Sequence, residues 1–206
     1  MIGFYNYTVI LTYIGTVFGF FGVYRASGGD TQAALICLMI AGFCDLFDGK
    51  IASTMKRTKQ EKRFGIQIDS LSDLICFGLL PATIVLKSTD GSPLYTAIAA
   101  TYLLCALIRL AWFNVDEEER QNNATGEREV YLGLPVTMSA ILLPFFFSLS
   151  KLLGLDPVML APWMLLCVAI AFLTPFKLRK PKTVGKIVMV LIGVGVLVTV
   201  ILGTRV

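Results

Sequence analysis

The sequence contains no histidine among its 206 residues. This absence excludes Ser-His-Asp triads, histidine-ligated zinc sites and histidine proton shuttles. Charged residues are also scarce, at 16% of the chain against about 25% in an average soluble domain, while 56% of the residues are hydrophobic against roughly 45–50%. This balance excludes a disordered chain, a collagen-like chain and a nucleic-acid-binding tail, and it favours a membrane protein.

The cysteines offer no C-x-x-C pair, although there are five of them. Each stands inside an apolar run, at Cys37, Cys44, Cys76, Cys105 and Cys167. This placement argues against a disulfide framework and against a zinc site. We therefore expect free, buried cysteines that act as small apolar side chains.

Long apolar runs, in contrast, are frequent. A bilayer core about 30 Å thick is crossed by about 20 mostly apolar helical residues. Seven stretches approach that length, at residues 5–25, 31–47, 66–87, 93–114, 132–150, 157–176 and 184–203. The amino terminus has no basic region or small-residue cleavage site of a signal peptide, and no alternating ten-residue pattern suggests a membrane β-barrel. We expect an all-α, polytopic membrane helix bundle that forms a single domain over residues 1–206.

Lysine and arginine gather on one side of these predicted spans. That side carries Lys50, Lys56, Arg57, Lys59, Lys62, Arg63, Arg120, Arg128, Lys177, Arg179, Lys180, Lys182 and Lys186. The opposite side carries only Arg25, Lys87, Lys151 and Arg205. Because basic loops stay in the cytoplasm, we expect the richer side and the amino terminus there, and the carboxyl terminus outside if all seven segments span. Attraction to anionic head groups is a compatible second role. Residues 115–131, the longest polar stretch, are expected to form a loop.

Two pairs of aspartates stand at the expected cytoplasmic side. Asp45 and Asp48 end the second segment at i, i+3 spacing, and Asp69 and Asp73 begin the third at i, i+4 spacing. Each pair therefore shares a helix face, and antiparallel neighbouring helices bring the pairs together. A charge inside a span costs about 2.5–3.5 kcal/mol, so four carboxylates need compensation. Divalent cations suit them, because hard metals bind carboxylate oxygens; the alternative is solvation or pairing with nearby lysines.

Small and basic residues surround these pairs. Gly49 and Ala52 would let a bulky group approach the backbone, or would serve helix packing. Gly65 precedes the third segment and could simply end the loop. The six basic residues between the pairs could hold phosphates. Metal and phosphate together at a membrane surface suggest phosphoryl transfer on a lipid-linked substrate.

This arrangement resembles the motif of the CDP-alcohol phosphotransferase family, D-x-x-D-G-x-x-A-R followed by G-x-x-x-D-x-x-x-D. The chain has Asp45-x-x-Asp48-Gly49-x-x-Ala52, then Gly65-x-x-x-Asp69-x-x-x-Asp73. It departs from the motif at Ser53, where the family usually has an arginine, and its spacer to Gly65 is longer than usual. The resemblance implies that the missing arginine contacts nucleotide-linked phosphates, so Arg57, Lys59, Lys62 or Arg63 could replace it from the longer loop. The CDP-diacylglycerol site implied in this way comprises Gly49, Ala52, Ser53, Arg57, Lys62, Gly65 and, from a weaker pattern that also includes Gly19, Thr12.

Further stretches resemble the phosphatidylserine synthase branch of this family. They are residues 64–73 with Phe77-Gly78 and Pro81-Ala82, residues 108–114, and Gly133-Leu134-Pro135. The resemblance covers roughly residues 8–150. It implies a six-helix core over about 5–176, with an additional helix over 184–203, and a homodimer. The reaction it implies is attack of the L-serine hydroxyl on the lipid-bearing phosphorus of CDP-diacylglycerol, which yields phosphatidylserine and CMP.

Residue roles follow from the same resemblance. Asp45, Asp48 and Asp69, completed by Asp73, are the implied ligands of a two-metal site for Mg²⁺ or Mn²⁺, with Ca²⁺ also compatible. Asp73 is the implied general base. Arg109 is the only basic residue well within a predicted span, and we expect it to bind the serine carboxylate or a substrate phosphate; snorkelling or pairing with a motif aspartate are its alternatives. Asn114 is expected to line the same pocket.

The four aspartates are also compatible with other functions. Inositol phosphate or glycerol phosphate as acceptor, or an archaeal-type lipid as donor, would use the same aspartates; residues 109–114 with Gly133-Leu134-Pro135 favour serine by resemblance. A small cation channel or carrier is a different class, but the four aspartates lie toward one side, and Asp90 and Asp156 fall in outer loops. A purely structural membrane protein leaves the ordered aspartates unexplained. Nothing indicates a nucleic-acid partner.

Overall fold

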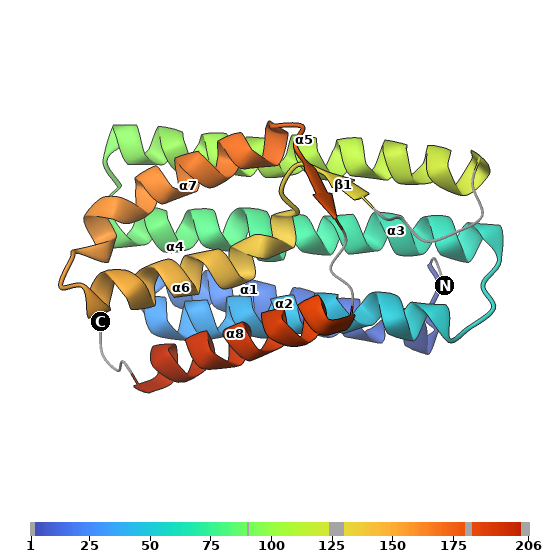
Figure 1. The fold of residues 1–206 in the computed structure, drawn as a ribbon, viewed down its shortest axis with the longest axis horizontal. Coiled ribbons are helices and arrows are strands. Elements are labelled where there is room, and N and C mark those ends of the chain that lie inside the picture. The colour runs from blue at the N-terminus through green and yellow to red at the C-terminus, as the bar shows by residue number, and fades with distance from the viewer. Residues whose placement is uncertain (1–2, 90, 124–129, 180–182, 203–206) are drawn as a thin grey trace.

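The protein is a bundle of helices that lie lengthwise beside one another (Figure 1). The computed structural model describes residues 3–89, 91–123, 130–179 and 183–202. Within these ranges the elements are α1 (Ile10–Ser27) after the 3-10 turn η1 (Tyr7–Val9), α2 (Thr31–Ser53), α3 (Lys59–Asp73), the π-helical η2 (Leu74–Leu79), α4 (Leu80–Ser88), α5 (Pro93–Asn123), β1 (Val130–Leu132), the 3-10 turn η3 (Val136–Met138), α6 (Ser139–Leu152), α7 (Pro157–Leu173), β2 (Lys177–Arg179) and α8 (Thr183–Leu202). Because α3, η2 and α4 form one continuous helix, each predicted span corresponds to one helical run, and the predicted all-α bundle is confirmed.

Three of these runs are long and apolar enough to cross a membrane, judged by length and composition: Tyr7–Ser27, Lys59–Ser88 and Pro93–Glu119. Shorter apolar helices cover Val136–Leu152, Pro157–Leu173 and Val190–Leu202. Large apolar side chains such as Phe20, Leu104 and Leu191 are exposed on the outside of the bundle. Such a surface suits lipid contact. That the last segment crosses the bilayer remains a prediction.

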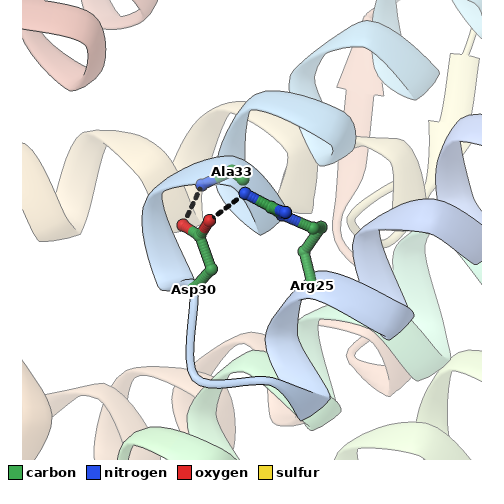
Figure 2. A network of polar contacts seen from close by, with 3 residues as sticks. All are labelled: Arg25, Asp30 and Ala33. Carbon is green, nitrogen blue, oxygen red and sulfur yellow. Dashed lines mark hydrogen bonds and ion pairs between the residues drawn. The ribbon is translucent and has the colours of Figure 1, made fainter.

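The turn between α1 and α2 is closed by polar contacts at the end of the bundle away from the aspartates. Asp30 accepts a hydrogen bond from the backbone N–H of Ala33 at 2.9 Å, which caps α2. The same carboxylate forms an ion pair with Arg25, as Figure 2 shows. Gly29, at φ +82°, supplies the left-handed conformation that the turn needs. Arg25 is thus held at the side that the sequence predicted to be poor in basic residues.

Glycines bring α1 close to its neighbours. A Cβ atom at Gly19 would lie 2.5 Å from the Cys76 Sγ, and one at Gly22 would lie 2.6 Å from a methyl carbon of Leu80. Small residues allow such close helix approach, and van der Waals packing drives helix association where lipid removes the hydrophobic effect. The packing of α1 therefore fixes it against the segment that follows Asp73.

Pro81 lies two residues after the π-helical segment η2. Pro81 has no backbone N–H, so the Phe77 carbonyl four residues earlier lacks its ordinary α-helical donor. The hydroxyl of the fully buried Tyr102 donates to this oxygen at 2.7 Å. The Ser139 hydroxyl lies 3.4 Å from the same oxygen, but its single proton has a closer acceptor in the Val136 carbonyl at 2.8 Å. A side chain of α5 thus satisfies the freed carbonyl, as is required away from water.

The connection between α2 and α3 is shorter than the sequence analysis suggested. Because α2 continues to Ser53 and α3 begins at Lys59, only residues 54–58 separate them. The predicted basic loop is therefore wrong for Lys50, Lys59, Lys62 and Arg63, which lie on helices. Thr58 and Glu61 form a capping box, with the Thr58 N–H 2.8 Å from Glu61 Oε2, and this starts α3 early. Gly65 consequently lies within α3 and does not end the loop.

The predicted loop 115–131 is wrong over residues 115–123, because α5 continues to Asn123. After it, β1 pairs antiparallel with β2, from Val130 opposite Arg179 to Leu132 opposite Lys177. Strands of three residues are too short to show an alternating pattern, so they were not predicted. The pair joins two connections that the sequence placed on the same side of the membrane. Arg128, Lys180, Lys182, Arg205 and Asp90 lie outside the described residues.

All five cysteines are free, as predicted. Cys44, Cys76 and Cys105 are buried, and Cys37 is half-buried. Burial was wrongly predicted for Cys167, which is exposed on α7. An exposed thiol costs little on an apolar outer surface, because a cysteine side chain behaves as a small hydrophobe.

Candidate active site

Three of the four predicted aspartates come together where the end of α2 meets α3. Asp45 and Asp48 on α2 and Asp69 on α3 each offer a carboxylate oxygen, and these oxygens all lie within 4.8 Å of one another. The three side chains are half-buried. The i, i+3 spacing turns Asp45 and Asp48 toward the same neighbour, and the short connection of residues 54–58 returns α3 beside them. The structure therefore produces the juxtaposition on which the metal prediction depends.

Asp73 lies one turn further along α3 and is more deeply placed, with 9% of the residue exposed. It lies close enough to Asp45, Asp48 and Asp69 to interact with them electrostatically. The π-helical segment η2 begins at the next residue. Such single π turns inside α-helices are frequent at functional sites, and this one follows the fourth aspartate directly.

The donor set of the cluster fits a divalent cation. Mg²⁺ and Ca²⁺ bind oxygen at about 2.0–2.6 Å, so ligands on opposite sides of one cation are about 4–5 Å apart. The spread of the three carboxylate oxygens, within 4.8 Å, matches that span. The ion pairs of Arg25 with Asp30 and of Arg63 with Glu118 do not involve these three aspartates. The cluster could therefore hold a cation, which would balance its charge.

Hydroxyl groups from α1 reach the acidic cluster. Thr12, which is buried, donates a hydrogen bond from Oγ1 to Asp48 Oδ2 at 3.4 Å. One turn later, Thr16 Oγ1 donates to Ser72 Oγ at 2.7 Å, beside Asp73. Thr12 was predicted from the sequence, whereas Thr16 and Ser72 were not. The sequence does contain a pattern from which they could be inferred. Thr12 and Thr16 are polar residues one helical turn apart inside an apolar segment, which indicates a shared polar neighbour.

The small residues that follow Asp48 leave space beside the cluster. A Cβ atom at Gly49 would meet nothing within 4 Å, and Ala52 is half-buried. Ser53, which stands in place of the expected arginine, is exposed and donates its hydroxyl to the Lys50 carbonyl at 2.7 Å. Its side chain therefore bonds to the backbone of its own helix.

Arg57 differs from the other basic residues that could replace the missing arginine. A Cβ atom at Gly65 would lie 3.1 Å from Arg57 Nη1, and Gly65 precedes Asp69 by one helical turn on the same face. Within the described part of the chain the Arg57 Nε is buried and has no hydrogen-bond partner. By contrast, Lys59 and Lys62 are exposed, and Arg63 pairs with Glu118 at 2.9 Å. The guanidinium of Arg57 thus lies next to the motif face of α3.

Arg109 and Asn114 lie on α5 and face different neighbours. Arg109 is only 5% exposed, which argues against snorkelling to the interface. Its Nε donates to the Leu134 carbonyl at 3.3 Å, and its guanidinium carbon lies 5.5 Å from the centre of the Trp112 ring. Asn114 accepts a hydrogen bond from Ser70 Oγ at 2.6 Å, beside Asp69.

The segment that bears Leu134 is held in place by the end of α7. Gly133 has φ +76°, and its N–H donates to the Phe176 carbonyl at 2.7 Å. A Cβ atom there would come within 3.0 Å of the Phe172 and Thr174 carbonyl oxygens, so glycine is required for both conformation and space. The Leu134 N–H donates to the Ala171 carbonyl at 3.1 Å. Gly133-Leu134-Pro135 therefore positions the carbonyl that Arg109 binds.

Comparison with known proteins bears on this site. The model of the CDP-alcohol phosphatidyltransferase family matches residues 5–202, which include α8. An archaetidylserine synthase of Methanothermobacter thermautotrophicus is 28% identical over 139 residues, 67% of this chain and 56% of the relative. The CDP-diacylglycerol–serine O-phosphatidyltransferase of Saccharomyces cerevisiae is 32% identical over 121 residues, 57% of this chain and 43% of the relative. A protein of the same name from Helicobacter pylori strain 26695 is 26% identical over 140 residues, 67% of this chain and 55% of the relative.

The matched part of the chain spans about half the length of these relatives. The family match, in contrast, extends over nearly all of this chain and takes in the acidic cluster together with the helices that position it. With its long apolar helices, the chain is a membrane protein that belongs to the CDP-alcohol phosphatidyltransferase family.

Proposed function

We propose that this protein transfers the phosphatidyl group of CDP-diacylglycerol to L-serine, giving phosphatidylserine and CMP. The observation that carries the proposal is the carboxylate cluster of Asp45, Asp48 and Asp69 in a chain of this family. Serine as the acceptor rests on the names of the relatives, among which CDP-diacylglycerol–serine O-phosphatidyltransferases recur.

The cluster is the proposed metal centre. Asp45, Asp48 and Asp69 would hold Mg²⁺ or Mn²⁺, with Asp73 completing a two-metal site. Metal bound there supplies positive charge that neutralises the diphosphate and the departing phosphate. Thr12 restrains Asp48 through its hydroxyl, and so orients that carboxylate toward the others.

Asp73 is the proposed general base. As the serine oxygen bonds to the lipid-bearing phosphorus and the bond from phosphorus to the CMP oxygen breaks, the hydroxyl proton passes to the Asp73 carboxylate. Its place supports this role, because Asp73 lies one helical turn beyond Asp69 on the same face, and a base must lie within reach of the phosphorus that the metal centre would hold. The hydrogen bond from Thr16 to Ser72 connects the residue before Asp73 to α1.

Arg57 is the proposed replacement for the arginine that the motif lacks at Ser53. Its guanidinium lies against Gly65, one turn from Asp69, and its buried Nε has an unused donor. A diphosphate near the acidic cluster would accept from that donor and offset its burial. Gly49 and Ala52 leave room for the nucleotide on the opposite helix. Lys62 is proposed to add only long-range attraction, because its side chain is exposed.

Arg109 and Asn114 are the proposed serine-binding residues. Arg109 is buried within the bundle, and its Nε donates to the Leu134 carbonyl. A guanidinium carries five N–H donors and binds a carboxylate, such as that of serine, with two of them. Asn114 accepts a hydrogen bond from Ser70 on α3, and Ser70 is the residue after Asp69. The proposal also places the site at the cytoplasmic face and the protein in a homodimer.

The test is incorporation of radiolabelled serine into lipid by the purified protein, with CDP-diacylglycerol and Mn²⁺ or Mg²⁺. We expect label in lipid that EDTA abolishes and added metal restores. CMP release with inositol phosphate or glycerol phosphate, but not with serine, would contradict serine as the acceptor. It would still support transfer of the phosphatidyl group from CDP-diacylglycerol. Activity only with a CDP-linked archaeal ether lipid would contradict CDP-diacylglycerol as the donor. No CMP release with any of these pairs would contradict the proposed function itself.

A further inference from the structure

An apolar pocket of about 230 Å³ lies between α2, the start of α6 and α8. Its walls are almost entirely apolar, with Met39 and Phe43 from α2 and Gly193, Val194 and Leu197 from α8. Asp45, a member of the carboxylate cluster, also lines it. The mostly apolar pocket therefore shares one wall residue with the proposed site of chemistry.

The shape of the pocket indicates an elongated occupant. Its α2 wall extends from Met39 to Leu46 and its α8 wall from Val190 to Leu197, each about 10 Å long at about 1.5 Å per helical residue. Phe43 and Val194 line it while 58% and 53% exposed, so it borders the outer surface of the bundle. A ligand could thus enter sideways from the bilayer.

The side chains that line the pocket restrict the class of ligand that it can bind. Apart from Asp45 and Thr137, the lining residues have no polar side chain, so most of the pocket offers an ordered water no partner. The geometry points to a hydrocarbon chain of the lipid-linked donor as the occupant, with its diphosphate head beside Asp45. This inference rests on the proposed function, and it assigns to α8 a part in holding the donor.

Such a pocket would act by positioning. A lipid chain gains little by leaving the bilayer for a protein wall, because lipid tails are as apolar as leucine. Fixing one chain does, however, restrict where the attached head can lie, and a misplacement of about 1 Å at a reacting centre can cost about a hundredfold in rate. The pocket should therefore raise kcat/KM for donors whose chains are long enough to fill it.

Two glycines of α8 provide a matched pair for the test. A Cβ atom at Gly193 or at Gly195 would meet nothing within 4 Å, so both positions have room for a larger side chain. Gly193 lines the pocket, whereas Gly195 is exposed and is not among its lining residues. We would compare Gly193→Phe and Gly195→Phe with the unaltered protein, using CDP-dipalmitoylglycerol and CDP-dihexanoylglycerol as donors.

We expect Gly193→Phe to lower the long-chain to short-chain ratio of kcat/KM at least about tenfold. Gly195→Phe should leave that ratio unchanged. An unchanged ratio in Gly193→Phe, or an equal fall in both variants, would overturn the inference. If the unaltered protein transfers the phosphatidyl group of neither donor to serine, the proposed function is contradicted. In that case the photolabelling experiment below tests the pocket without relying on activity.

Photolabelling of the unaltered protein does not depend on how the variants fold. CDP-diacylglycerol with a diazirine on one acyl chain should label peptides that contain residues 39–46 or 190–197. Excess unlabelled CDP-diacylglycerol should suppress this labelling, and phosphatidylcholine at the same concentration should not. Label confined to other helices, or equal suppression by phosphatidylcholine, would overturn the assignment of this pocket to the donor.

Discussion

At the scale of single residues, one hydroxyl connects α1 to the proposed metal centre. Thr12 donates to Asp48, whereas Thr16, one turn later on the same helix, donates to Ser72. Loss of a partner that orients a ligand typically costs about 10–100-fold in metal affinity. We therefore expect Thr12→Val to weaken Mn²⁺ binding by about that factor, measured by electron paramagnetic resonance of free Mn²⁺. Thr16→Val is the matched control, and an equal loss in both variants would contradict the role of Thr12.

A second residue-scale prediction concerns Arg57. If the buried Nε of Arg57 donates to the donor's diphosphate, Arg57→Ala should raise the KM for CDP-diacylglycerol roughly tenfold to a hundredfold, because such charged hydrogen bonds contribute about 1.5–3 kcal/mol. Arg57→Lys should recover only part of the loss, since lysine keeps the charge without the planar fork. The KM for serine should change little. Lys59→Ala, at an exposed position, is the control. A similar rise in that variant would indicate general attraction to the lipid surface.

These residues show what spacing alone can and cannot predict. The positions of Asp45, Asp48 and Asp69 were predictable, because helical periodicity and antiparallel neighbours leave them few alternatives. The choice among Arg57 and the nearby lysines was not. It depends on how a short connection turns and on where α3 begins, and a capping box at Thr58 decides the latter.

At the scale of elements, the contact between α1 and η2 gives a prediction with a built-in rescue. Gly19→Ala should destabilise the protein by about 1–3 kcal/mol, the usual cost of overpacking, because the new Cβ would lie 2.5 Å from Cys76 Sγ. Cys76→Ala removes that sulfur, and the next atoms, at 3.4 and 3.5 Å, are in ordinary contact. Unfolding by denaturant in detergent micelles should show Gly19→Ala/Cys76→Ala to be more stable than the sum of the single changes. Strict additivity would mean that the two helices do not meet in this way.

The π-helical segment supports a further element-scale prediction. Tyr102→Phe removes the donor to the Phe77 carbonyl at 2.7 Å, and the Ser139 hydroxyl, 3.4 Å from that oxygen, could replace it only by giving up its 2.8 Å bond to the Val136 carbonyl. Hydrogen bonds between membrane helices contribute on average about 0.6 and at most about 1.7 kcal/mol. We expect a loss of stability in that range, measured by the same unfolding experiment, together with lower kcat because η2 adjoins Asp73. Tyr24→Phe, at an exposed position, should change neither quantity.

The helices were predictable from the sequence and their irregularities were not. Long apolar runs indicated every helical span, since few other structures satisfy the backbone in lipid. Because Pro81 has no backbone N–H, the sequence implies that the Phe77 carbonyl lacks its helical donor. It does not indicate which neighbouring hydroxyl replaces that donor. The pairing of β1 with β2 depends on contacts between segments about 45 residues apart, for which a local pattern gives no information.

At the scale of the whole molecule, the two ends of the bundle differ in charge. The end with the acidic cluster carries the exposed Lys50, Lys56, Lys59, Lys62 and Lys177, whereas the α1–α2 turn at the other end carries Arg25, already paired with Asp30. The connection between α2 and α3 lies at one end of the bundle, and the connection between α6 and α7 at the other (Figure 1). Because lysine-rich connections are retained in the cytoplasm, the acidic cluster should face the cytosol, where a soluble acceptor such as serine would reach it.

Cysteine labelling tests this orientation with one probe at each end. In a variant whose native cysteines are replaced by alanine, Lys56→Cys marks the α2–α3 connection and Leu153→Cys marks the end of α6; both positions are exposed. A membrane-impermeant maleimide added to intact cells should label Leu153→Cys only, and Lys56→Cys should react after permeabilisation. The opposite pattern would place the acidic cluster outside and reverse the proposed topology. Labelling of both from outside would show that these connections do not lie on opposite sides of the membrane.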